Sequence, residues 1–453
     1  MNPSDDADPG MSPSTPRNTL FASLWAVVAA FGTYFCMYGF RKPYTAGSYE
    51  TLATLGGFDL KTLLVISQVG GYMVSKFLGI KFISELPPAR RAVGILFLIG
   101  WAELALFGFA LTPAPWGFIF LFLNGLPLGM VFGLVLGFLE GRRHTEALAA
   151  GLCASFILAD GVMKSIGAAL LNLGVSEHWM PAAAGACFFL PTLIFVGMLT
   201  RIAPPDSHDV AARSRRGTLN RHERWNLFTK YALGLVFLII AYLLVTILRS
   251  IRADFQPQIL KGLGVEYDAG LFTRVELWVG GAVLMVNGAL VAITNNRSAF
   301  FASLGICIAG FFILSGSLLG LQIGLLSPVP FVVLCGLGLY FPYAAIHTTV
   351  FERLLAATKD KGTSSYLLQL ADSFGYLGYI AVLVGNLILK RSVRGPTTAD
   401  DAAFARFFIE TCWVVSVLGL LFLMGATWFF LSKVKRPAVS PPALTPELLT
   451  ASA

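Results

Sequence analysis

The chain has 453 residues, of which 56% are hydrophobic and only 13% are charged, and its formal net charge is +8. Its apolar residues form runs longer than soluble core helices need, which excludes an ordinary soluble domain and predicts an all-α integral membrane protein. The positive charge does not indicate nucleic-acid binding, because the basic residues gather beside alternate loops between the apolar runs.

Twelve runs of spanning length are predicted along the chain. A transmembrane helix needs about 20 predominantly apolar residues. The runs cover residues 20–40, 62–84, 92–111, 115–139, 147–172, 179–200, 227–248, 269–293, 298–318, 328–350, 364–389 and 406–432. Because the first run is too long for a signal-peptide core, residues 1–19 are predicted to be a disordered tail ahead of an uncleaved helix.

The basic residues predict how the chain is oriented in the membrane. Cytoplasmic loops carry an excess of lysine and arginine. The clusters are Arg90 and Arg91; Arg142 and Arg143; Arg213, Arg215, Arg216, Arg221 and Arg224; Arg353, Lys359 and Lys361; Lys433, Lys435 and Arg436. Both termini are therefore predicted to face the cytoplasm, in a bacterial inner (plasma) membrane. One segment, residues 390–406, departs from this rule because it is basic on the predicted outer side.

An internal repeat divides the chain in two. Leu158-Ala159-Asp160 recurs as Leu370-Ala371-Asp372, at an offset of 372 − 160 = 212, and Arg41 matches Arg249 at 249 − 41 = 208. The sequence therefore predicts a 6+6 pseudo-two-fold architecture of the major facilitator type. Residues 20–202 and 227–432 form its two six-helix bundles, joined by a basic cytoplasmic linker at 203–226, and a cytoplasmic tail follows at 433–453.

Two arginines predict an anion site. Arg41 closes the run 20–40, and Arg249 follows the apolar residues 231–248. A charge at membrane depth is tolerated mainly when it faces a polar cavity or a counter-charge. The planar arginine fork binds phosphate or carboxylate oxygens two at a time. The alternative is that Arg41 extends to the outer membrane surface from the end of its helix.

The residues around both arginines resemble a known family. Residues 34–42 read YFCMYGFRK, and residues 248–257 read LRSIRADFQP. These stretches are similar to the first and seventh helices of the organophosphate:phosphate antiporters, the glycerol-3-phosphate and hexose-phosphate transporters of the major facilitator superfamily. Weaker similarity covers residues 75–77, 374–378 and Glu276.

The resemblance implies roles for seven residues. The phosphate would be bound by Arg41 and Arg249, and the site would be lined by Tyr34 and Tyr38. The cation Lys42 would pair with Asp254 or Glu276 on the other half of the molecule.

Further ionisable residues are candidates for coupling. At the position where the family usually carries a histidine, the chain has Asp160, followed by Lys164 at helical i, i+4 spacing. This pair is either a structural ion pair or a coupling element. Asp372 has no basic neighbour in its run and is a candidate proton relay. His347 is either a core histidine or a proton carrier. Arg252 is interpreted as an interfacial residue.

The function favoured by these patterns is secondary transport of a small anionic solute, a phosphate ester exchanged for phosphate, by alternating access. No nucleotide-binding loop is present in the sequence, and neither an enzyme, a cofactor nor a metal site is expected. The expected partners are the solute and the lipid bilayer, with no nucleic acid and a monomeric protein. The alternatives are a proton-coupled symporter of a non-phosphorylated solute and a transporter-like membrane sensor.

Overall fold

The computed structural model describes residues 16–49, 60–139, 145–202, 221–358, 364–394 and 401–434. Every element in these ranges is a helix. Most of the predicted tails, residues 203–220 of the predicted linker and several predicted cytoplasmic basic residues lie outside the described residues. So does the central part of the basic segment 390–406.

The first half of the chain folds into six long helices with two short 3-10 turns. They are α1 (Pro16–Gly39), η1 (Pro43–Ala46), α2 (Leu60–Glu85), η2 (Pro88–Arg90), α3 (Arg91–Leu111), α4 (Phe118–Leu139), α5 (Thr145–Asn172) and α6 (Met180–Thr200). Helix α1 packs on α4, α5 and α6, while α4 packs on α2 and α3. We call these six helices the N-terminal bundle.

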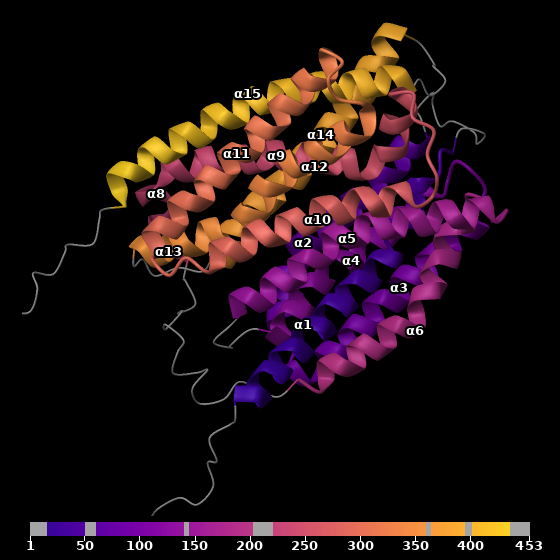
Figure 1. The fold of residues 1–453 in the computed structure, drawn as a ribbon. Helices are drawn as coiled ribbons and strands as arrows, with labels where there is room; N and C mark the ends of the chain where they lie inside the picture. The colour runs from indigo at the N-terminus through magenta and orange to yellow at the C-terminus, as the bar shows by residue number, and fades with distance from the viewer. Residues whose placement is uncertain are drawn as a thin grey trace, which may run out of the picture.

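The second half repeats this arrangement. It comprises α8 (Arg221–Lys230), α9 (Ala232–Gly262), α10 (Leu271–Val291), α11 (Asn296–Gln322), α12 (Pro328–Ala345), the π-helical η3 (Ile346–Val350), α13 (Phe351–Thr358), α14 (Ser364–Arg394) and α15 (Asp401–Lys433). Helix α9 packs on α12, α14 and α15, and α11 packs on α12 and α15. We call this group the C-terminal bundle. In Figure 1 the two bundles lie side by side.

The described residues therefore confirm the predicted 6+6 helical membrane fold. Nine of their helices are long and apolar enough to cross a membrane. The long helices α2, α10 and α14 fall outside that set, and each of them contacts the opposite bundle, α2 against α14 and α10 against α5. A helix that faces protein on both sides can carry more polar residues than one that faces lipid.

Several predicted boundaries differ from the structure. Helix α1 begins at Pro16, within the predicted tail, and α8 begins at Arg221, within the predicted linker. Helix α9 continues to Gly262, 262 − 248 = 14 residues beyond the predicted end of its apolar run. The extension was missed because it is charged, and three of its charged side chains, Arg249, Arg252 and Asp254, are buried rather than exposed at a membrane surface.

Candidate functional site

Arg41 is held by the turn that ends α1. Pro43, which begins η1, cannot continue a helix, and the backbone N–H groups of Arg41 and Lys42 both bond to the Tyr38 carbonyl. The carbonyls that the helix end leaves free are satisfied by two amide side chains. Asn124 Nδ2 donates to Phe40 O at 3.0 Å, and Gln68 Nε2 donates to Arg41 O at 2.9 Å.

The Arg41 side chain packs against aromatic rings. Its guanidinium carbon lies 4.0 Å from the ring centroid of Tyr72 and 5.5 Å from that of Tyr38. Only 6% of the residue is exposed. Tyr34, which the resemblance implies as a lining residue together with Tyr38, is buried beside it with ring centroids 5.6 Å apart. The guanidinium charge is thus held by ring faces.

Arg249 has an equivalent setting in the C-terminal bundle. Its guanidinium carbon lies 4.4 Å from the Tyr343 ring centroid and 5.9 Å from that of Tyr340, and 8% of the residue is exposed. Its nearest hydrogen bond is to Ser250 Oγ at 3.4 Å. Neither Arg249 nor Arg41 forms an ion pair with a carboxylate among the residues that the structure describes.

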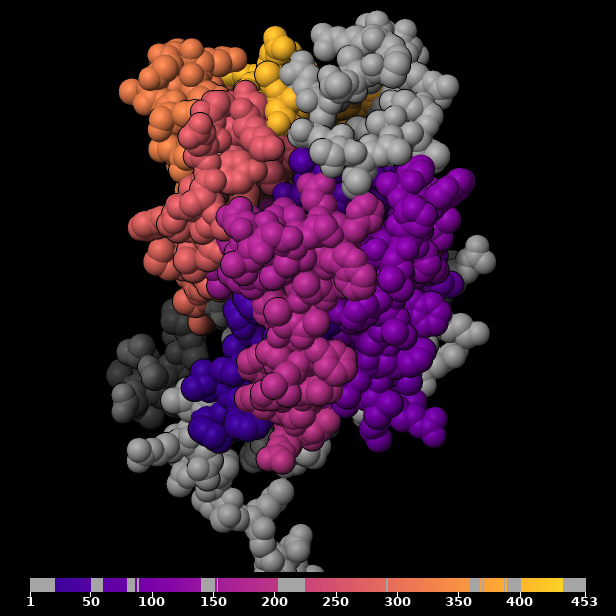
Figure 2. Space-filling model, turned by 90° about the vertical axis from the view of Figure 1, so that its right-hand side faces the viewer, coloured from indigo at the N-terminus to yellow at the C-terminus, as the bar shows by residue number. Residues whose placement is uncertain are grey.

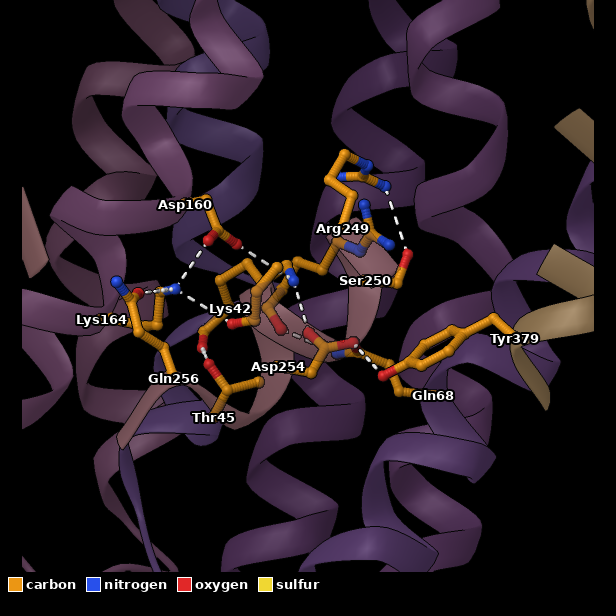
Figure 3. Close-up of polar contacts among 12 residues, drawn as sticks. Lys42, Thr45, Gln68, Asp160, Lys164, Arg249, Ser250, Asp254, Gln256 and Tyr379 are labelled. Carbon is orange, nitrogen blue, oxygen red and sulfur yellow. Dashed lines mark hydrogen bonds and ion pairs between the residues drawn. The ribbon is translucent and has the colours of Figure 1, made fainter. Parts of the chain in front are cut away.

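Lys42 joins the bundles. Its Nζ lies 2.5 Å from Asp254 Oδ1 on α9 and 3.1 Å from Asp160 Oδ1 on α5. Figure 3 shows Lys42 between these two carboxylates. Tyr379 on α14 donates to Asp254 Oδ2 at 2.8 Å, and Lys164 Nζ lies 2.7 Å from Asp160 Oδ2. Of the two partners suggested for Lys42, the structure pairs it with Asp254.

Lys164 forms a second link to α9. It donates to Gln256 Oε1 at 2.6 Å and to Ala253 O at 3.0 Å (Figure 3). The carbonyl of Ala253 is available because Pro257, four residues later, has no N–H to complete the helical ladder. Phe255 between them leaves helical geometry, with φ −119° and ψ 19°.

Two expectations about charged partners are corrected. Glu276 pairs with Arg252 at 2.8 Å rather than with Lys42. Arg252 is 1% exposed, so it is a buried residue and not an interfacial one. The salt bridge connects α9 to α10 inside one bundle.

Asp372 also has partners that the sequence did not indicate. Lys76 Nζ on α2 lies 2.8 Å from its Oδ2, and Tyr242 on α9 donates to its Oδ1 at 2.9 Å. The Tyr242 hydroxyl also lies 3.2 Å from His347 Nδ1, so this one hydroxyl bridges His347 and Asp372. Lys76 was missed because 296 residues separate it from Asp372.

Sequence reasoning also missed the second set of tyrosines. Tyr72 lies four residues before Lys76, and Tyr340 and Tyr343 lie three apart, so each pair shares a helix face. Tyr72 and Tyr376 bring their ring centroids within 5.2 Å across the bundle contact. This helical spacing of tyrosines beside a cation was the signal that could have found them.

The comparisons with known proteins bear on the family and the fold. The model of one family, described as a family of unknown function (DUF5690), matches residues 43–433. The chain belongs to this family. The matched residues include Arg249 and begin directly after Arg41 and Lys42. No curated protein matches the chain.

A crystal structure of a D-xylose-proton symporter has a similar fold. The two chains are 14% identical, with a TM-score of 0.59, and the similarity covers 90% of this chain and 97% of the symporter. At that identity the likeness concerns the fold alone. It supports the major facilitator architecture and does not assign this DUF5690 member to the organophosphate:phosphate antiporters.

The charges of the site leave a positive excess. Ten charged side chains form the arginine–tyrosine contacts and the buried ion pairs described above: Arg41, Lys42, Lys76, Lys164, Arg249, Arg252, Asp160, Asp254, Glu276 and Asp372. Among these ten, six cations less four carboxylates leave two positive charges, which are those of Arg41 and Arg249. Lys61 of α2 is a further buried cation, which donates to Thr45 O, Gly47 O and Gln258 Oε1. Among the residues searched, no group of His, Cys, Asp and Glu could hold a metal ion. The arrangement is suited to binding an anion.

Proposed function

We propose that this chain is a secondary transporter of a small anionic solute, a phosphate ester exchanged for phosphate, working by alternating access between the two bundles. The observation that carries the proposal is the setting of Arg41 and Arg249. Both guanidinium groups are buried, one in each bundle, with ring faces and no carboxylate among the described residues against them. A phosphate dianion would neutralise both charges and accept bidentate hydrogen bonds from each fork.

The ion pairs around Lys42 could couple substrate binding to movement of the bundles. An anion bound by Arg41 would lie beside Lys42 and would compete with Asp160 and Asp254 for its positive charge. Because Lys42 and Asp254 belong to different bundles, weakening this pair loosens one contact between them. Binding energy that differs between two conformations shifts their populations.

We propose the predicted orientation, with both termini in the cytoplasm of a bacterial inner membrane, as part of this function. The late parts of α1, α5 and α9 would then lie toward the outer side. The late part of α2 and the early part of α14 would lie toward the cytoplasm.

A proton-coupled symporter of a non-phosphorylated solute is the second candidate. It is favoured by the chain of Lys76, Asp372, Tyr242 and His347, which joins titratable groups of both bundles. A neutral solute would leave the two arginine charges without a counter-ion, and for that reason we prefer the anion.

Counterflow of labelled phosphate in proteoliposomes tests the proposal. Arg41→Lys and Arg249→Lys keep the positive charge but lose the planar guanidinium that can bind two oxygens at once. Each should therefore weaken phosphate affinity by about ten- to a hundredfold, which corresponds to the loss of one charge-assisted hydrogen bond. Arg274→Lys, at an exposed position on α10, is the matched control. Unchanged phosphate affinity in both buried variants would contradict the proposed phosphate site. Phosphate binding without counterflow would favour the alternative of a transporter-like membrane sensor.

A further inference from the structure

Glu103 is a buried carboxyl group outside the site described above. It lies on α3, is 7% exposed, and neither of its carboxyl oxygens has a hydrogen-bond partner among the described residues. It forms no ion pair with a described residue, whereas Asp160, Asp254, Glu276 and Asp372 each lie within ion-pair distance of a lysine or arginine. Glu103 therefore needs a different explanation.

The Glu103 side chain lies inside the N-terminal bundle and not against lipid. Its neighbours Trp101 and Leu104 are among the exposed residues of α3, whereas Glu103 faces α6 and the end of α1. A Cβ atom added to Gly185 of α6 would lie 2.9 Å from Glu103 Cδ and 3.1 Å from Phe40 Cδ1. The carboxyl group thus fits only because residue 185 has no side chain. Figure 2 shows the side of the molecule where α3 and α6 pack against each other.

No charged residue of the packing helices offers Glu103 a partner. Helices α4 and α6 contain no Asp, Glu, Lys, Arg or His in their ranges. The titratable groups of the elements around it are Arg17, Tyr34, Cys36 and Tyr38 of α1, Arg41 and Lys42 beyond its end, Cys187 of α6, Arg90 of η2, and Arg91 at the start of α3. None of them forms a described ion pair with Glu103.

An ionised carboxylate in this position would lose its water without gaining a hydrogen bond or a counter-charge. Groups in such settings take up a proton and become neutral instead. We propose that Glu103 is a proton-binding site, loaded in this conformation, and that its loading is linked to the position of the end of α1. Uptake forms one O–H bond with a proton from water, and release returns that proton to water.

The link to α1 runs through one amide. Asn124 Nδ2 donates both to Phe40 O at 3.0 Å and to Ala102 O at 2.9 Å. These carbonyls belong to the residues directly before Arg41 and Glu103. Movement that admits water to an ionised Glu103 would therefore displace the backbone that carries Arg41. Raising the pH favours the ionised form and with it the more open arrangement.

Infrared difference spectroscopy of the purified full-length protein tests the protonation. The parent should show a protonated-carboxyl band at neutral pH that Glu103→Gln lacks. Glu266→Gln, at an exposed position between α9 and α10, is the control and should keep the band, and Glu103→Asp should shift it. An identical band in Glu103→Gln and the parent would overturn the proposal. This measurement needs no substrate, so it is independent of the proposed function.

Hydrogen exchange tests the link. In the ligand-free parent, the exchange of residues 41–46 should rise with pH beyond the intrinsic chemical rate, by up to about tenfold per pH unit for one linked proton. Glu103→Gln should lose that extra slope, and Glu266→Gln should retain it. If the slope persists in Glu103→Gln, the proton is not linked to α1. A failure of phosphate counterflow would affect only the proposed transport function.

Discussion

At the scale of single residues, arginine and lysine have different roles in this interior. The guanidinium groups of Arg41 and Arg249 lie over tyrosine rings, where a planar, weakly hydrated cation is stabilised without a carboxylate. The ammonium of Lys42 is a compact charge and lies between two carboxylates. The lysine thus already has its counter-charges, whereas the two arginines have no described carboxylate partner, which is why we propose them as the anion-binding groups.

The ion pairs of α10 give a prediction about stability. Arg252 and Glu276 are buried, with 2% and 0% of their side chains exposed, whereas Arg274 and Asp268 are 58% and 63% exposed. Arg252→Gln should lower the free energy of unfolding by about 3–5 kcal/mol, because it leaves Glu276 buried without a charge partner.

The exposed pair is the control for that experiment. Hydrogen bonds from Arg274 lower the pKa of Asp268, but water screens both groups, so Arg274→Gln should change stability little. Thermal unfolding in detergent compares the two variants. Equal shifts in the melting temperature would contradict the assigned roles.

At the scale of the element, the break in α9 connects the bundles. Pro257 removes one rung of the helical ladder, and the carbonyl of Ala253 that it frees accepts a hydrogen bond from Lys164 of the other bundle. The non-helical Phe255 and the side chain of Gln256 lie in the same stretch. The sequence shows the proline, but the lysine that uses its effect belongs to α5.

Restoring the ladder should loosen this contact. Pro257→Ala supplies an N–H to Ala253 O in competition with Lys164, so we expect a larger population with the α5 to α9 contact open. Cysteine labelling along residues 253–258 measures the opening. Pro191→Ala, inside α6 of a single bundle, is the control and should leave the labelling unchanged. Labelling of Pro257→Ala at the parental rate would contradict the proposed competition.

At the scale of the whole molecule, two groups of polar contacts hold the bundles together. One joins Lys42, Lys61 and Lys164 to α9 and Ser165 to Thr273 on α10, and the other joins Lys76 to Asp372 on α14. In the up-and-down order of the helices, the late parts of α1, α5 and α9 lie at one end. The late part of α2 and the early part of α14 lie at the other end. The structure therefore links the bundles toward both sides.

Removing one link at a time should have opposite effects. Lys42→Ala leaves Asp254 without its lysine and should favour opening at the predicted outer side, whereas Asp372→Asn weakens the pair with Lys76 and should favour opening at the cytoplasmic side. Labelling of single cysteines from each side of the membrane distinguishes these outcomes. The same change in both variants would show that the two contacts do not act as opposing gates.

The sequence by itself was enough to predict an integral membrane protein, the repeat of six helices in each half, and the two arginines at membrane depth. Bilayer thickness sets the minimum length of a spanning apolar run. A charge at the end of or within such a run costs free energy in any fold, so it can be recognised as unusual from the sequence alone. The pair of Asp160 and Lys164 was also predictable, because i, i+4 spacing is a property of one helix. Tertiary structure alone decided that Glu276 pairs with Arg252, that Asp372 pairs with Lys76, and that Glu103 has no described partner. These outcomes depend on which helix faces meet across the bundles, and no local pattern encodes the distance between side chains on different helices.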